Sequence, residues 1–314
     1  MKLPGRLSRR PLCAVRTRVI YNEHKDGFDA GVKNTMGPLD GPAGASPLTD
    51  LDIALPQDVA EGADSKNFVT AFARGLSVMT AFSGQNRPMT LSDVARIVDL
   101  PRATVRRCLL TLQALNYVES DGRYFSLSPQ VLMLARAYLS SSVLPRVAQP
   151  FIERVSESTG ESCSVSILHG ADVIYIARSA RRRMASLHRD VGTHLPAFCT
   201  SMGRVLLATL PPRELDKLLA TATLERHTPR TVTDLAALRD IITAVAQDGL
   251  CEVNQELEMD LRSIAIPIRN TSGTIVAAMN VSTSAARTTH KHLRGPILSA
   301  MRQAAADMRP LLIT

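Results

Sequence analysis

Residues 89–127 contain a succession of local patterns that few folds can accommodate. The segment MTLSDVARIV combines a residue able to cap a helix with one apolar helical face. The turn DLP follows, and Pro101 is well placed as the first residue of the next helix, PRATVRRCLLTLQALNYV. Two short alternating runs then flank the Asp121-Gly122 pair, which is a strong local signal for a tight β-hairpin. Helix, turn, helix and hairpin is the order of a winged helix-turn-helix.

The second helix of this motif carries three arginines on the face opposite its apolar residues. We expect it to bury Val105, Cys108, Leu109, Leu112 and Leu115. The major groove of DNA is wide enough for one helix, where arginine pairs with guanine or phosphate, while the preceding helix braces the backbone. The alternative is that these arginines form only a solvated helix face. We predict a DNA-binding surface made of Thr90, Ser92, Arg102, Ala103, Thr104, Arg106, Arg107 and Arg123.

Positive charge is concentrated in the same region of the chain. The 314 residues carry a net charge of +8, of which residues 66–142 contribute +5, against −1 for residues 1–65 and +4 for residues 143–314. Aromatic residues make up only 4% of the chain and tryptophan is absent, which argues against a surface that stacks single-stranded bases. Duplex phosphate is therefore the expected polyanion.

The N-terminal part of the chain shows no sustained apolar period. Glycine and proline break residues 1–65, and we expect a disordered tail there. Two alternatives remain open: a basic arm that touches DNA, or a translation start further downstream, for instance at Met36. Order is expected from residue 66, beginning with a helix whose apolar stripe contains Phe68, Phe72, Leu76, Met79 and Phe82.

The remainder of the chain divides into a linker and a mixed α/β domain. Residues 129–142, PQVLMLARAYLSSS, read as a linker helix that follows a winged helix-turn-helix of residues 66–128. In residues 143–314 we expect a helix over residues 146–159 ended by Gly160, a β-hairpin, three helices, the strands IAIPI and TIVAAMNVS, and a helix over residues 290–309. Strands at both ends of a helical middle predict an α+β fold with a helix-covered antiparallel sheet in residues 143–314.

The sequence contains no recognisable catalytic or cofactor-binding motif. There is no Walker loop and no GxGxxG, and Cys199 beside Ser201 has no histidine and acid in a recognisable relation to it. The five cysteines are scattered without a CxxC pair, which indicates reduced thiols, and no apolar run is long enough to cross a bilayer. We therefore expect a cytoplasmic protein that is not an enzyme and needs no metal, cofactor or membrane.

Four segments resemble the IclR family of bacterial transcription regulators: LPRATVRRCLLTLQALNYV, LPAFCTSMGRVLLA, GLCEVNQELEMDLRSIAIPI and TIVAAMNVS. Within the family, RRRMASLHRDVGTHLPAFCTSMGRVLLA is most similar to regulators of the β-ketoadipate pathway. That branch senses protocatechuate, p-hydroxybenzoate or β-ketoadipate and commonly activates its target operons. The resemblance implies an N-terminal winged helix-turn-helix, a linker helix and a GAF/PAS-like effector domain, assembled as homodimers or tetramers.

The resemblance also implies an effector pocket between the start of the SMGR helix and two late strands. Some relatives that bind small keto acids have Asp, Cys and Ser where this chain has Val253, Ser263 and Asn280. The less polar valine favours a larger or aromatic acid, held by hydroxyl, amide and helix N–H donors. The alternative for the polar strand residues is ordinary strand-end hydrogen bonding. The implied effector-binding residues are Thr200, Ser201, Met202, Val253, Ser263, Asn280 and Ser282.

These observations predict a regulator that binds double-stranded operator DNA and a small organic acid from aromatic catabolism. We expect it to activate degradation genes, with RNA polymerase as a further partner. A repressor of the same family that responds to another small carboxylic acid is one alternative. Two rivals come from other classes: an unliganded architectural DNA-binding protein, and an enzyme that uses Cys199.

Overall fold

The computed structural model describes residues 68–85, 87–180 and 190–313. The predicted tail of residues 1–65 lies outside the described residues.

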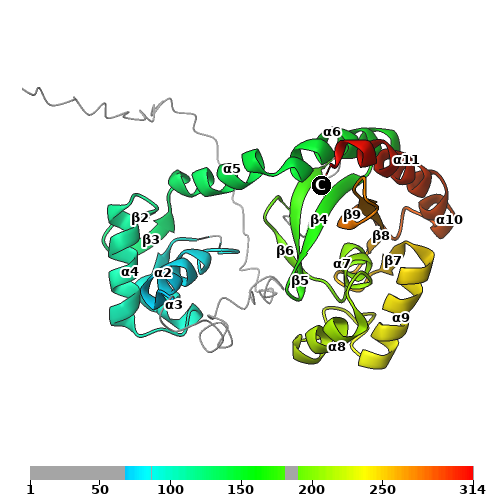
Figure 1. The fold of residues 1–314 in the computed structure, drawn as a ribbon. Coiled ribbons are helices and arrows are strands. Elements are labelled where there is room, and N and C mark those ends of the chain that lie inside the picture. Colours follow the sequence, from blue (N-terminus) through cyan, green and yellow to red (C-terminus); the bar gives the residue numbers. More distant parts are fainter. Residues whose placement is uncertain (1–67, 86, 181–189, 314) are drawn as a thin grey trace, which may run out of the picture. The chain divides into compact units, whose positions relative to one another are not determined.

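The first described region contains three helices and a small antiparallel sheet with strand order β1-β3-β2 (Figure 1). Its helices are α2 (Thr70–Thr80), α3 (Leu91–Ile97) and α4 (Arg102–Ala114). Its strands are β1 (Met89–Thr90), β2 (Val118–Ser120) and β3 (Tyr124–Leu127). The helices share one core that includes Val78, Val94, Val105, Leu109 and Leu112. The winged helix-turn-helix is therefore present, with a third strand, β1, that was not predicted.

Local hydrogen bonds explain where these elements begin and turn. Thr90 and Asp93 form a capping box at the start of α3: Thr90 Oγ1 accepts from the Asp93 N–H at 3.2 Å, and the Asp93 carboxylate accepts from the Thr90 N–H at 3.0 Å. In the hairpin, Asp121 Oδ1 accepts from the N–H groups of Arg123 and Tyr124. Gly122 has a φ of +100°, which favours glycine. The predicted hairpin is confirmed.

Two details of the predicted helical core are wrong. On α2, Phe72 and Leu76 are 67% and 45% exposed, whereas Val78 is fully buried. On α4, Leu115 is exposed as well. The reason is that α2 has apolar residues on two sides and packs one of them against α4.

Residues 129–131 form a 3₁₀ turn that leads into α5 (Leu132–Ser141), which contains no buried residue. The next helix, α6 (Val143–Thr159), begins three residues earlier than predicted and ends as expected at Gly160, whose φ is +70°. A helix was thus correctly predicted on each side of Ser142.

The second described region is built on one six-stranded antiparallel sheet with strand order β6-β5-β4-β9-β8-β7 (Figure 1). Its strands are β4 (Ser162–His169), β5 (Asp172–Ser179), β6 (His194–Pro196), β7 (Cys251–Asn254), β8 (Leu261–Arg269) and β9 (Ile275–Ser284). Its helices after α6 are α7 (Ser201–Leu207), α8 (Pro212–Thr221), α9 (Leu235–Asp248), α10 (His290–His292) and α11 (Leu298–Met308). The predicted α+β class with a helix-covered antiparallel sheet is confirmed.

The last predicted helix is interrupted. Residues 293–297 form a π-helical segment between α10 and α11, and Gly295 within it has non-helical φ and ψ angles. Pro296 follows, which has no N–H to donate to a helical hydrogen bond.

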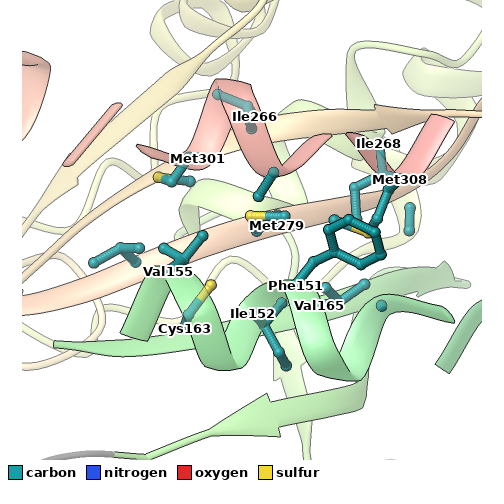
Figure 2. Close-up of a cluster of buried hydrophobic side chains, with 14 of the residues drawn as sticks. Phe151, Ile152, Val155, Cys163, Val165, Ile266, Ile268, Met279, Met301 and Met308 are labelled. Atoms are coloured by element: carbon teal, nitrogen blue, oxygen red, sulfur yellow. The ribbon is translucent and has the colours of Figure 1, made fainter. Parts of the chain in front are cut away.

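The two faces of the sheet differ in character because side chains alternate along each strand. One face is apolar and packs against α6 and α11; Figure 2 shows Phe151 of α6 and Met301 of α11 near Met279 of β9. The other face packs against α7, and small or polar side chains lie there, including Ser166, Ala265 and Asn280. Because the side chains on this face are smaller and more polar, they leave room for a pocket.

Candidate DNA-binding surface and effector pocket

Helix α4 presents its predicted DNA-binding residues in two groups. Arg102, Ala103 and Arg106 are exposed. Arg107, which is exposed as well, and the half-buried Thr104 lie along a groove between α4 and α2. None of the α4 arginines forms an ion pair with the residues that the structure describes, so their charge is available to an external anion.

The remaining predicted contacts lie on α3 and the hairpin. Ser92 is exposed on the first turn of α3, whereas the hydroxyl of Thr90 is engaged with Asp93 in the capping box. Arg123 is exposed beside the hairpin turn, with its guanidinium 5.2 Å from the centre of the Tyr124 ring. Thr90 therefore shapes the start of α3, while Ser92 and Arg123 are free to contact a phosphate.

The groove between α2 and α4, here called the α2–α4 groove, was not predicted. It is largely apolar, and Phe72 and Leu76 of α2 line it with exposed side chains. Apolar residues on two sides of α2 were the sequence signal that could have revealed it. Further residues that line it are Met79, Cys108, Leu112, Leu115 and Tyr117.

A second hollow, here called the α7 pocket, lies between α7 and the sheet. It contains about 300 Å³ of space not filled by protein, the solvent at its mouth included. Six of the seven residues implied as effector-binding line it: Thr200, Ser201, Val253, Ser263, Asn280 and Ser282. Sequence reasoning missed four other lining residues: Tyr175, Cys199, Leu257 and Leu261.

Met202, the seventh implied residue, is not among the pocket-lining residues. Its side chain is fully buried, and its sulfur accepts a hydrogen bond from the Ser166 hydroxyl at 3.2 Å. Along α7, consecutive residues point in different directions, so Ser201 reaches the pocket while Met202 enters the core. Met202 therefore packs in the core next to the pocket and does not line it.

The polar groups of the α7 pocket are arranged in pairs. The hydroxyls of Ser201 and Ser263 are 2.9 Å apart, and Asn280 Nδ2 donates to the Ser282 hydroxyl at 3.1 Å. Thr200 Oγ1 donates to the Pro196 carbonyl at 3.0 Å and caps α7. None of the described residues that line the pocket is charged, so a bound acid would be held by neutral donors.

A buried ion pair joins two walls of the pocket. The guanidinium of Arg204 is 2% exposed and makes two hydrogen bonds of 2.7 Å to the Glu256 carboxylate, while its Nε donates to the Phe198 carbonyl. Phe198 precedes Cys199 and Glu256 precedes Leu257, and both of these neighbours line the pocket. The ion pair therefore positions two segments of the pocket wall.

Cys199 does not have the properties of a catalytic nucleophile. Burial raises the pKa of its thiol to about 12, although the positive charge of Arg204 acts in the opposite direction. A thiolate is the reactive form of cysteine, and it is scarce at neutral pH when the pKa is this high. Among the described residues, no cluster of His, Cys, Asp and Glu could hold a metal ion. No helix in the described ranges is long and apolar enough to cross a membrane.

Two models of known protein families match this chain. The model of the bacterial transcriptional regulator IclR C-terminal domain matches residues 136–309, and the model of the IclR helix-turn-helix domain matches residues 71–122. The chain belongs to the IclR family. Members of this family are DNA-binding transcriptional regulators, so the chain is one as well.

IclR-family relatives agree with the predicted branch. The chain is 45% identical to the Pca regulon regulatory protein of Pseudomonas putida, over 77% of this chain and 84% of that one. It is 31% identical to the p-hydroxybenzoate hydroxylase transcriptional activator of Acinetobacter baylyi, over 79% and 93%. A solved IclR homologue from Microbacterium hydrocarbonoxydans, complexed with 4-hydroxybenzoate, is 26% identical with a TM-score of 0.66 and coverage of 77% and 98%. The resemblance to the β-ketoadipate branch is confirmed.

Proposed function

We propose that this IclR-family regulator activates genes of aromatic catabolism when an aromatic acid occupies its α7 pocket. The observation that carries the proposal is a pocket of neutral donors and apolar walls beside α7, in the same chain as a cationic helix α4. We assign residues 66–128 to DNA binding, 129–142 to a linker and 143–314 to effector binding. The protein would act in the cytoplasm, contact RNA polymerase as an activator, and catalyse no reaction.

DNA recognition is assigned to α4. Arg102 and Arg106 would reach base edges or phosphates of the major groove, and Ala103 would permit close approach of the backbone. Ser92 and Arg123 would contact phosphates on either side. This assignment is supported by the exposure of both α4 arginines and by their lack of an ion-pair partner in the described ranges.

A second copy of the chain is proposed to cover the α2–α4 groove. Phe72 and Leu76 expose apolar surface there, and a contiguous apolar patch of this kind is typical of a protein interface. A two-fold dimer would place two α4 helices about one turn of DNA apart, on a near-palindromic operator. Pairing of dimers into tetramers is proposed from the family resemblance.

The effector is proposed to be an aromatic acid with a single ring. Val253 and Leu257 provide apolar walls, and the hydroxyls of Ser201 and Ser263 can donate to a carboxylate. The 4-hydroxybenzoate complex of the Microbacterium homologue and the activator name of the Acinetobacter relative support this class of ligand and this direction of control.

Arg106→Ala is expected to weaken specific operator binding about tenfold to a hundredfold, because it removes one major-groove contact. The measurement is titration of the operator fragment over a series of salt concentrations. Arg213→Ala is the matched control, since Arg213 is exposed on α8 and its loss removes the same charge. Unchanged affinity in Arg106→Ala would contradict the assignment of α4, and a footprint without two-fold symmetry would contradict the dimer.

Ser201→Ala is expected to weaken binding of 4-hydroxybenzoate about threefold to tenfold, because one neutral hydrogen bond to the carboxylate is lost. Isothermal titration calorimetry on the full chain measures the change. Ser158→Ala, on the exposed surface of α6, is the matched control. Equal affinity in wild type and Ser201→Ala would show that this hydroxyl does not contact the effector.

A further inference from the structure

One polar atom in the α7 pocket has no partner. Asn280 is 4% exposed, and its side-chain nitrogen donates to the Ser282 hydroxyl at 3.1 Å. Its side-chain oxygen, Oδ1, is buried and accepts no hydrogen bond from any described residue. Leaving a buried carbonyl oxygen unpaired is unfavourable, so buried polar atoms of this kind are normally satisfied.

None of the hydroxyls of Thr200, Ser201, Ser263 and Ser282 donates to Asn280 Oδ1. The Ser201 and Ser263 hydroxyls are paired with each other, and Thr200 Oγ1 donates to the Pro196 carbonyl. Ser282 already accepts from Asn280 Nδ2. A hydroxyl group on a ligand in the pocket would supply the donor that Asn280 Oδ1 lacks.

The position of Asn280 separates it from the groups that suit a carboxylate. Ser263 on β8 lies opposite Ser282 on β9, and Asn280 is two residues further along the same face of β9. Two residues span about 6.6 Å along a strand. The pocket thus has hydroxyl donors at one place and an unpaired acceptor at another, a polarity that matches a ligand with a carboxylate and a separate hydroxyl.

We propose that Asn280 is a specificity-determining residue whose Oδ1 accepts a hydrogen bond from a ring hydroxyl of the effector. This inference rests on the proposed function, and it narrows the effector from aromatic acids in general to hydroxylated ones. An acid without the hydroxyl leaves Oδ1 unpaired on binding and is discriminated against. Discrimination of this kind needs no charged residue in the pocket.

The test compares ligands of similar shape that differ in the donor. The affinities of wild-type protein for 3- and 4-hydroxybenzoate are measured by calorimetry against those for 3- and 4-methylbenzoate. At least one hydroxy acid is expected to bind about tenfold to a hundredfold more tightly than its methyl counterpart. If each hydroxy acid bound as tightly as its methyl counterpart, the inference about Asn280 would be overturned while the proposed effector class would stand. If none of the four acids bound, the proposed effector class would be refuted as well.

Two variants locate the discrimination at Asn280. In Asn280→Leu the hydroxy acid and its methyl counterpart are expected to bind with about equal affinity, because the acceptor is gone. In Asn280→Asp the preference should persist even if overall affinity falls, because a carboxylate still accepts and the Ser282 hydroxyl can donate to it. A preference retained in Asn280→Leu, or lost in Asn280→Asp, would overturn the inference.

The control is Ser201→Ala, which removes a different hydroxyl of the pocket. Both members of each ligand pair should weaken together, so that the hydroxy-to-methyl preference stays at its wild-type value. A preference that changes as much in Ser201→Ala as in Asn280→Leu would contradict the specific role of Asn280. Thermal unfolding of each variant confirms that the compared proteins are folded.

Discussion

Arg204→Met is expected to lower the free energy of unfolding by about 3–5 kcal/mol, because it leaves the Glu256 carboxylate buried without its countercharge. The substitution also removes the hydrogen bond from Nε to the Phe198 carbonyl. Glu256 would retain only neutral donors such as the Val232 N–H. Urea unfolding followed by circular dichroism measures the change at equilibrium.

The matched control is Arg239→Met. Arg239 forms an ion pair with Asp216 at 2.8 Å, but both side chains are about half exposed, so its loss should cost less than about 1 kcal/mol. Removing both buried charges, in Arg204→Met with Glu256→Met, should recover much of the loss, because no unpaired charge remains. A loss of under about 1 kcal/mol in Arg204→Met would show that the pair does not hold the α7 pocket together.

Gly203→Ala is expected to destabilise the protein by about 3 kcal/mol or more, although helix propensity alone favours alanine by up to about 1 kcal/mol. A Cβ on Gly203 would lie 2.1 Å from the Ala197 carbonyl oxygen, and that oxygen belongs to the backbone and cannot rotate away. Either α7 or the segment before it must move, and both line or support the pocket. Thermal and urea unfolding together detect the loss.

For Gly75→Ala, also a substitution of a helical glycine, we expect the opposite effect on stability. Gly75 lies within α2, and no atom lies within 4 Å of where its Cβ would be. This substitution should stabilise the protein by up to about 1 kcal/mol, because alanine restricts the unfolded chain. If Gly203→Ala proved as stable as wild type, the close contact between α7 and Ala197 would be absent in solution.

The elements of this fold follow from short-range patterns that are legible in the sequence. The Asp121-Gly122 pair sets the hairpin because the aspartate side chain bonds the next backbone N–H groups. Alternation of serine with Cys163 and Val165 places one face of β4 on the apolar core and the other towards α7. Weak or two-sided patterns were the ones that misled: the short strands β1, β6 and β7 were not predicted, and the predicted apolar stripe of α2 contains Phe72 and Leu76, which are exposed.

The effector pocket could be predicted only in part, and mainly through family resemblance. That route reached Ser201, Ser263 and Asn280, which lie on α7, β8 and β9. It missed Tyr175 and Leu257, which reach the pocket from β5 and from the loop before β8. No local pattern marks these residues, since a tyrosine in a strand or a leucine in a loop has many ordinary roles.

By itself, the amino-acid sequence determined the cationic helix after a tight turn, the hairpin that follows it and the mixed α/β character of the rest. Each of these depends on hydrogen bonds and side-chain periods that extend over a few residues. Only the tertiary structure decided that Arg204 pairs with Glu256, 52 residues away, and that Asn280 Oδ1 is left without a partner. Both outcomes depend on strand register and on how α7 packs against the sheet, which bring together groups that no local interaction links.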